Sequence, residues 1–135
     1  EALEARLREI ESPSTSLAQE FEDCYGASWG LRQFLWAHDI DDALVAQRIL
    51  EVLPKDKFIG ILRFLAADYW SHYVGWPDLL VFRHGEHFLA EVKGSGDKLS
   101  DDQKDWIQQN SRLMQIPFKL VRVRRLRTVE RPEKL

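Results

Sequence analysis

Three side chains in two short segments of the sequence have the types and spacing to do chemistry together. Asp78 follows Trp76-Pro77, and Glu91 and Lys93 lie two residues apart in a later segment. Carboxylate oxygens are the ligands that a hard divalent cation prefers, and an ammonium group offsets the negative charge of a phosphate. Brought together, two carboxylates and one amine could support metal-assisted cleavage of a phosphodiester.

A β-hairpin is the element that would bring these segments together. Apolar runs over 79–82 and 88–92 flank the polar stretch 83–87, which is the pattern of two strands and a turn. With His84-Gly85 as a two-residue turn, the register places Asp78 directly opposite Glu91. Opposite residues share a face of the sheet, with Cβ atoms roughly 4.5–5.5 Å apart.

The site depends on this register. Lys93 lies two residues beyond Glu91 and therefore joins the same face, whereas a slip of one residue would separate the two acids. Each residue also has a plainer interpretation. Pro77-Asp78 is an ordinary turn signal, and Lys93 could simply neutralise Glu91 in a structural ion pair. Glu91 is harder to explain this way because carboxylates are seldom buried without a partner.

The rest of the sequence predicts helices around this hairpin. We expect helices over 2–11, about 15–25, 41–53, a run starting at Pro54 and about 100–114, and a last strand over 118–124. Ser100 and Gln103 fit a capping box at the start of the long helix. A hairpin, a helical crossover and a third strand make an α/β fold with a mixed sheet and helices packed on it.

Several apolar residues are expected to lie in the core. The predicted buried positions are Leu3, Leu7, Ile10, Leu17, Phe21, Cys24, Phe58, Ile61, Leu62, Leu65, Ala66, Trp106, Ile107 and Leu113, together with an aromatic cluster of Trp29, Phe34, Leu35 and Trp36.

Composition narrows the class of protein. A chain of 135 residues that is 44% hydrophobic is expected to form one domain, and no apolar run approaches the ~20 residues of a membrane span. The N-terminus does not resemble a signal peptide, and a single cysteine excludes an internal disulfide and a cysteine-rich zinc site. We therefore expect an intracellular protein. The four histidines show no spacing typical of a catalytic triad or a zinc site; they are His38, His72, His84 and His87.

Basic residues concentrate near the C-terminus. Residues 112–135 contain eight basic and two acidic residues, although the whole chain has a net charge of −3. The stripe comprises Lys119, Arg122, Arg124, Arg125 and Arg127. It could contact phosphates or guard an exposed edge strand against aggregation.

The motif segments are Gly75-Trp76-Pro77-Asp78-Leu79-Leu80, Ala90-Glu91-Val92-Lys93-Gly94 and Asp97-Lys98-Leu99-Ser100, followed by Gln103 and Trp106. Together they resemble the VRR-NUC nuclease module of the PD-(D/E)xK superfamily, in the version found at the C-terminal end of the Fanconi-associated nucleases and their bacterial relatives. The resemblance implies a restriction-endonuclease-like mixed central sheet flanked by helices. It divides the chain into a helical N-terminal portion (1–74), a catalytic core (75–127) and a tail (128–135).

The resemblance also implies a function: a Mg²⁺- or Mn²⁺-dependent nuclease that acts on structured DNA, branched or flap, in DNA repair. Asp78, Glu91 and the backbone carbonyl of Val92 would bind the metal. Lys93 would orient the attacking water or stabilise the phosphate, and Gln103 would support the site.

One feature of the family is missing from the sequence. The family also uses a glutamate on an upstream helix, and no segment here matches that motif. Glu20 or Glu22 could replace it, or the chain could be a fragment that lacks one metal ligand. Two alternatives therefore stay open: a catalytically weak or inactive DNA-binding fragment, and a homodimeric junction resolvase.

Overall fold

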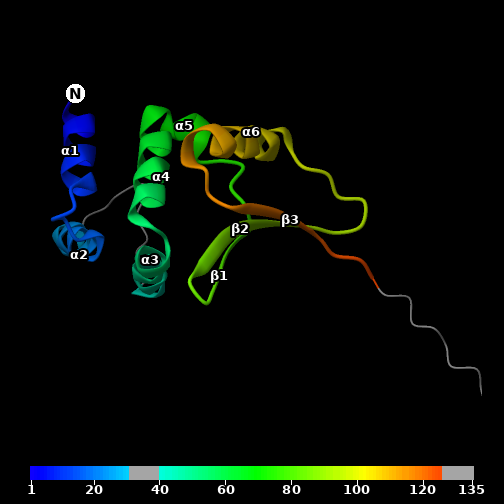
Figure 1. Ribbon diagram of the computed structural model, residues 1–135, viewed down its shortest axis with the longest axis horizontal. Coiled ribbons are helices and arrows are strands. Elements are labelled where there is room, and N and C mark those ends of the chain that lie inside the picture. The colour runs from blue at the N-terminus through cyan, green and yellow to red at the C-terminus, as the bar shows by residue number, and fades with distance from the viewer. Residues whose placement is uncertain (31–39, 126–135) are drawn as a thin grey trace, which may run out of the picture.

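The computed structural model describes residues 1–30 and 40–125 of the chain. Its elements follow the order α1 (Ala2–Glu11), α2 (Leu17–Ser28), α3 (Ile40–Val52), α4 (Lys55–Ala67), α5 (Tyr69–His72), β1 (Leu79–Arg83), β2 (Glu86–Lys93), α6 (Asp101–Gln109), the π-helical turn η1 (Asn110–Met114) and β3 (Phe118–Arg122). The predicted α/β class is confirmed, and α5 is a short helix that the sequence patterns did not predict (Figure 1).

The sheet is mixed and has three strands in the order β1-β2-β3. The hairpin register is the predicted one: Arg83 pairs with Glu86 and Leu79 pairs with Ala90. His84 and Gly85 form the turn with φ of +51° and +83°, as the right-handed twist of a hairpin requires. β3 pairs with β2 in parallel, with Lys93 opposite Arg122. The long connection needed between parallel strands is supplied by α6 and η1.

The core lies where α4, α6 and β3 meet. Phe64 of α4 packs with the buried side chains of Trp106, Met114 and Ile116, and Leu89 of the central strand contacts this cluster. In Figure 1, α6 lies across one face of the sheet. This cluster contains residues from before and after position 75, so the N-terminal helical portion packs on the strands. The predicted division into portions 1–74, 75–127 and 128–135 stays a prediction.

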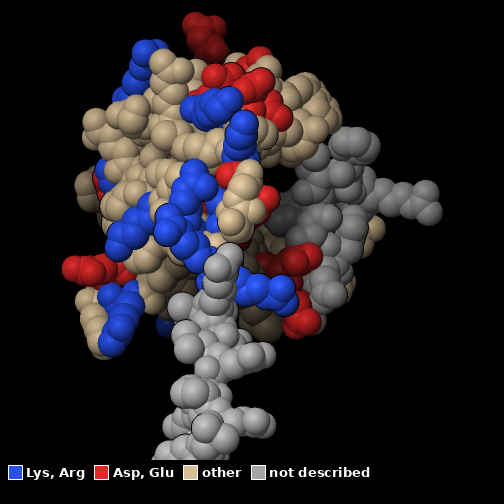
Figure 2. Space-filling model, turned by 90° about the vertical axis from the view of Figure 1, so that its right-hand side faces the viewer, with Lys and Arg blue, Asp and Glu red and all other residues tan. Residues whose placement is uncertain are grey.

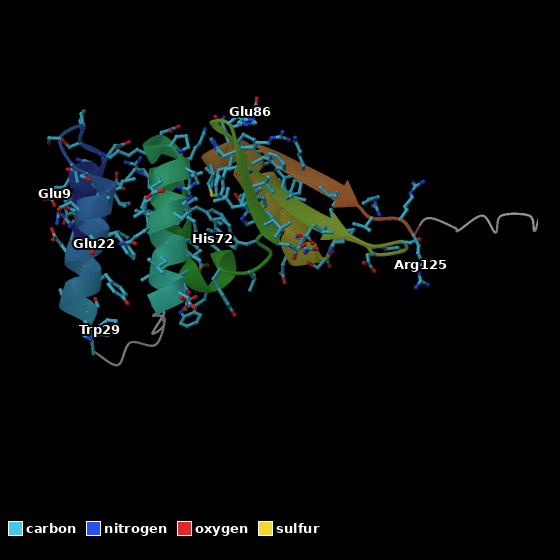
Figure 3. All side chains as sticks on the ribbon, turned by 90° about the horizontal axis from the view of Figure 1, so that it is seen from below. Glu9, Glu22, Trp29, His72, Glu86 and Arg125 are labelled. Carbon is cyan, nitrogen blue, oxygen red and sulfur yellow. The ribbon has the colours of Figure 1, made fainter. Side chains whose placement is uncertain are left out.

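The N-terminal helices lie at the other end of the molecule from the strands. α1 contacts α4, and α2 contacts α3; Figures 1 and 3 both show α3 and α4 between α2 and the sheet. Lys55 at the start of α4 donates to the carbonyl groups of Ser12 and Thr15, which ties α4 to the connection between α1 and α2. Within residues 1–30 and 40–125, no helix is long and apolar enough to cross a membrane.

Some predicted core positions are wrong. Leu3, Trp29 and Ala66 are exposed, and so is Cys24, because α2 buries none of its residues. On α4 the buried side chains are Ile59 and Phe64 rather than the predicted set. Other predictions fall on Phe34, Leu35, Trp36, His38, Arg127 and the tail 128–135, which lie outside the described residues.

The end of the long helix differs from prediction for a clear reason. Leu113, expected in the core, is 60% exposed, whereas Met114 is 2% exposed. The π-turn bonds the amide of Gln115 to the carbonyl of Asn110, five residues back instead of four. This wider turn rotates the following side chains relative to an α-helix, and Asn110 locks it by bonding both the N–H and the carbonyl of Ile116.

Candidate active site

The hairpin brings the two motif carboxylates to the same place. Asp78 directly precedes β1, and continuing the register beyond Leu79 and Ala90 places it opposite Glu91. The backbone N–H of Val92 donates to Asp78 Oδ2 at 2.9 Å. Asp78 is therefore oriented by the strand that carries Glu91, and its Oδ1 accepts no hydrogen bond from the described residues.

Glu91 is the most unusual residue of the site, because it is a carboxylate that is only 2% exposed. Its Oε1 accepts from Lys93 Nζ at 2.7 Å and from the side-chain amide of Gln103 at 2.5 Å. Its Oε2 is buried and has no hydrogen-bond partner among the described residues. Leaving one oxygen of a buried carboxylate unpaired is costly, so this atom is a candidate ligand for a cation.

Lys93 lies on the same face of β2 as Glu91, as predicted. Its side chain is 14% exposed, so its ammonium group is largely removed from bulk water. A partly desolvated ammonium that contacts one oxygen of Glu91 can still donate to a substrate phosphate or to a water.

Gln103 bonds both to the cap of α6 and to Glu91. Its Oε1 accepts from the N–H of Ser100, and Ser100 Oγ accepts from the N–H of Gln103, which completes the predicted capping box. The other end of the same amide, Nε2, donates to Glu91. The cap therefore fixes the orientation of the amide, and the amide in turn orients the buried carboxylate.

The loop 75–78 before β1, here called the motif loop, packs closely against the first turn of α6. A Cβ atom on Gly75 would lie 2.3 Å from the carbonyl oxygen of Asp102 and 3.0 Å from the nitrogen of Gln103, and Gly75 has φ of +77°. Trp76 extends this contact, because its ring centroid lies 5.3 Å from that of Trp106 of α6, while its indole N–H donates to the carbonyl of His72 of α5. Gly75 belongs to the first motif segment, and its lack of a side chain permits this close approach.

The oxygen donors fit a hard divalent cation. The unpaired Oε2 of Glu91, the carboxylate of Asp78 and the backbone carbonyl of Val92 form an all-oxygen set, and Mg²⁺ characteristically keeps several waters in addition to its protein ligands. Across residues 1–30 and 40–125, however, no group of three or more His, Cys, Asp or Glu side chains could hold a metal ion. The protein's share of such a site would thus be two side chains and one carbonyl.

The structure excludes both substitutes for the upstream glutamate. Glu20 pairs with Arg6, and Glu22 accepts from Gln47 of α3. Both lie on α2, and Figure 3 labels Glu22 on the far side of α3 and α4 from the sheet. Neither carboxylate can therefore reach Glu91 in this arrangement.

The predicted basic stripe does not lie on one face. Lys119 pairs with Ala90, and its ammonium lies 3.9 Å above the ring of Phe88, on the face opposite to Glu91. Arg122, in contrast, pairs with Lys93 and shares the face of the site. Figure 2 shows Lys and Arg side chains gathered where the described chain ends.

The fold and the site define an α/β domain with a carboxylate pair and a lysine on a mixed sheet, and comparisons with known proteins agree with this class. The family model described as the VRR-NUC domain matches residues 12–125. The chain therefore belongs to the VRR-NUC domain family.

Two relatives of this chain are a Fanconi-associated nuclease 1 and a homologue of it. Mouse Fanconi-associated nuclease 1 is 36% identical over 117 residues, covering 84% of this chain and 12% of the relative. The rice homologue of Fanconi-associated nuclease 1 is 46% identical over 90 residues, covering 62% of this chain and 8% of the relative. The chain thus spans about a tenth of the length of these relatives.

A solved structure confirms the fold. The crystal structure of paFAN1 bound to DNA with a 2-nucleotide 5′ flap and a gap superposes with a TM-score of 0.76 at 24% identity, covering 92% of this chain and 23% of that one. At this level of identity the likeness establishes the fold.

Proposed function

We propose that this chain is a nuclease domain that uses Mg²⁺ or Mn²⁺ to hydrolyse a phosphodiester bond in flap or branched DNA. The observation that carries the proposal is the half-satisfied carboxylate of Glu91, which is buried, held by Lys93 and Gln103 through one oxygen, and unpaired at the other. The relatives named as nucleases and the paFAN1 complex with flap DNA supply the substrate class. With this function we also propose an intracellular location and a role in DNA repair.

Each residue of the site would have its own role in the reaction. Asp78, Glu91 and the Val92 carbonyl would hold the metal, which when bound lowers the pKa of water and offsets phosphate charge. Lys93 donates to the attacking water or to a phosphate oxygen, where negative charge grows as the new bond to phosphorus forms and the old one breaks. Gln103 holds Glu91 in position and is a positioning residue.

The direct test is cleavage of a labelled flap duplex by the wild type and by Asp78→Asn and Glu91→Gln variants. We expect wild-type cleavage to require Mg²⁺ or Mn²⁺, to stop in chelator, and to fall about 100-fold or more in either variant, because each replacement removes a charge that holds the cation. Glu86→Gln is the matched control, since Glu86 lies on the same strand at the turn end of the hairpin (Figure 3) and should retain activity.

A second candidate function is favoured by one observation. The described residues offer only two carboxylates at the site, which suits a DNA-binding domain with weak or no catalysis. DNA binding by the wild type without nicking in Mn²⁺ would support this candidate, whereas cleavage that persists in chelator or survives both substitutions would contradict the nuclease proposal. The homodimeric junction resolvase stays a prediction, and a monomeric mass in solution would exclude it.

A further inference from the structure

Arg122 is placed next to the catalytic set without being part of it. It lies directly opposite Lys93 in the parallel ladder, so the two side chains share the face of the sheet that carries Glu91. Its guanidinium donates to the backbone carbonyl of Asp97 at a long 3.4 Å. In the described part of the chain, no carboxylate forms an ion pair with Arg122 or Arg124.

Three arginines of the N-terminal helices are used differently. Arg6 and Arg48 each pair with a glutamate of their own helix, and Arg63 of α4 pairs with Glu4 and Glu11 of α1. These pairs use the guanidinium for contacts within or between helices. Arg122 and Arg124 form no ion pair with a described residue, so apart from the long bond from Arg122 to Asp97 their donors stay available at the C-terminal end of β3.

A pocket adjoins these two arginines. It has a volume of about 340 Å³ and is lined by Arg122, Val123, Arg124 and the loop 94–96. A Cβ on Gly96 would meet no atom within 4 Å, so the loop leaves space above its backbone. The Asp97 carboxylate turns back to accept from the N–H of Gly94 at 2.8 Å, which leaves the arginines as the charged side chains of the lining.

The start of α6 is a poorer place for an anion, although helix N-termini often bind one. Asp101 and Asp102 occupy its first turn. The ammonium of Lys104 hydrogen-bonds to Asp101 and lowers the pKa of that carboxyl, so the first turn keeps its negative charge at neutral pH. An anion that reaches the site therefore meets a favourable charge on the Arg122 side rather than at α6.

We propose that Arg122, with Arg124 beside it, binds the backbone phosphate next to the scissile one and so sets the register of the DNA strand in the site. This inference rests on the proposed function. Lys93 and Arg122 lie on neighbouring strands, and the backbones of such strands are about 4.8 Å apart. Their two charged side chains can therefore contact successive phosphates of one DNA strand, each of which carries one charge. The planar fork of arginine matches phosphate oxygens in a bidentate manner, which a lysine cannot reproduce.

The first experiment measures binding of a fluorescein-labelled flap duplex in chelator at a series of salt concentrations, so that it does not depend on cleavage. Loss of one phosphate contact should reduce the slope of log K against log salt by about one in Arg122→Ala. Arg122→Lys should keep the slope with weaker binding, because it retains the charge and loses the fork. Arg83→Ala is the matched control at the turn end of the hairpin and should leave the slope unchanged.

The second experiment locates the phosphate. A series of duplexes, each with one backbone phosphate replaced by a neutral methylphosphonate, is titrated with the wild type and with Arg122→Ala. We expect the replacement adjacent to the cleavage position to weaken wild-type binding and to have no further effect on Arg122→Ala. A slope equal to that of the wild type, or identical methylphosphonate profiles for the two proteins, overturns the assignment. If no cleavage occurs but Arg122→Ala still lowers the salt slope, the proposed function is refuted and Arg122 keeps only its role as a phosphate contact.

Discussion

The proposed chemistry of this site depends most on Glu91. A carboxylate removed from water needs partners for both of its oxygens, and Glu91 has them for one. A purely structural ion pair with Lys93 would leave the second oxygen unsatisfied at a cost of about 1–3 kcal/mol. A cation bound at Oε2 removes this penalty, which explains why the arrangement suits a binding site better than a structural pair.

Gln103 offers a test of how Glu91 is held. Gln103→Ala removes the amide that donates to Glu91 together with half of the capping box. Because loss of a hydrogen bond that orients a metal ligand typically costs 10–100-fold, we expect cleavage to fall by about that factor. Steady-state cleavage assays and thermal unfolding of the same samples measure the two effects.

Ser100→Ala is the matched control for this test, since it removes the other half of the cap and leaves the amide of Gln103 in place. It should lower the free energy of unfolding by about 1 kcal/mol with nearly wild-type cleavage. Equal losses of cleavage in the two variants would mean that Gln103 acts only through the stability of α6.

At the scale of elements, the hairpin was predictable because two independent rules agree on it. The His84-Gly85 turn fixes the register, and the alternation of side chains then determines which residues share the face of Glu91. The capping box was predictable for a similar reason, because it depends on residues three apart in one helix. Rules that depend only on neighbouring residues can be applied directly to the sequence.

Features that depend on packing were not predictable in the same way. The π-turn moves Leu113 outward and Met114 inward, and nothing in an α-helical period signals it. The unpaired oxygen of Glu91 and the contact of its other oxygen with Gln103 depend on how α6 meets the sheet. The exposure of Cys24 likewise reflects how little of α2 is covered.

The fit between the motif loop and α6 can be tested with glycine substitutions. Gly75 and Gly85 both have positive φ, at +77° and +83°, but an added Cβ meets the Asp102 backbone only at Gly75. Both alanine variants should suffer the conformational cost of about 1–2 kcal/mol, and Gly75→Ala should lose about 1–3 kcal/mol more through overpacking. Chemical denaturation measures the difference.

We also expect Gly75→Ala to lose cleavage, because relief of the clash must shift either the loop before Asp78 or the helix that carries Gln103. Gly85→Ala should keep it. If the two variants prove equally stable and equally active, the close approach at Gly75 does not position the site.

At the scale of the whole molecule, charge is separated along the long axis. Residues 1–30, which form α1 and α2, contain seven acidic and two basic residues, and these two helices lie at the opposite end of the structure from Arg125 (Figure 3). A separation of this kind orients the end that carries Arg122 and the site toward a polyanion. The same layout explains why Glu20 and Glu22 cannot contribute to the site, which the linear sequence could not exclude.

The central claim is that Asp78 and Glu91 together bind one divalent cation. Calorimetric titration of the wild-type chain with Mn²⁺ tests it most directly, with Glu91→Gln and Glu86→Gln titrated alongside. We predict a single Mn²⁺ site in the wild type, retained in Glu86→Gln and lost in Glu91→Gln. Equal Mn²⁺ binding by all three proteins, or none by the wild type, would contradict the account.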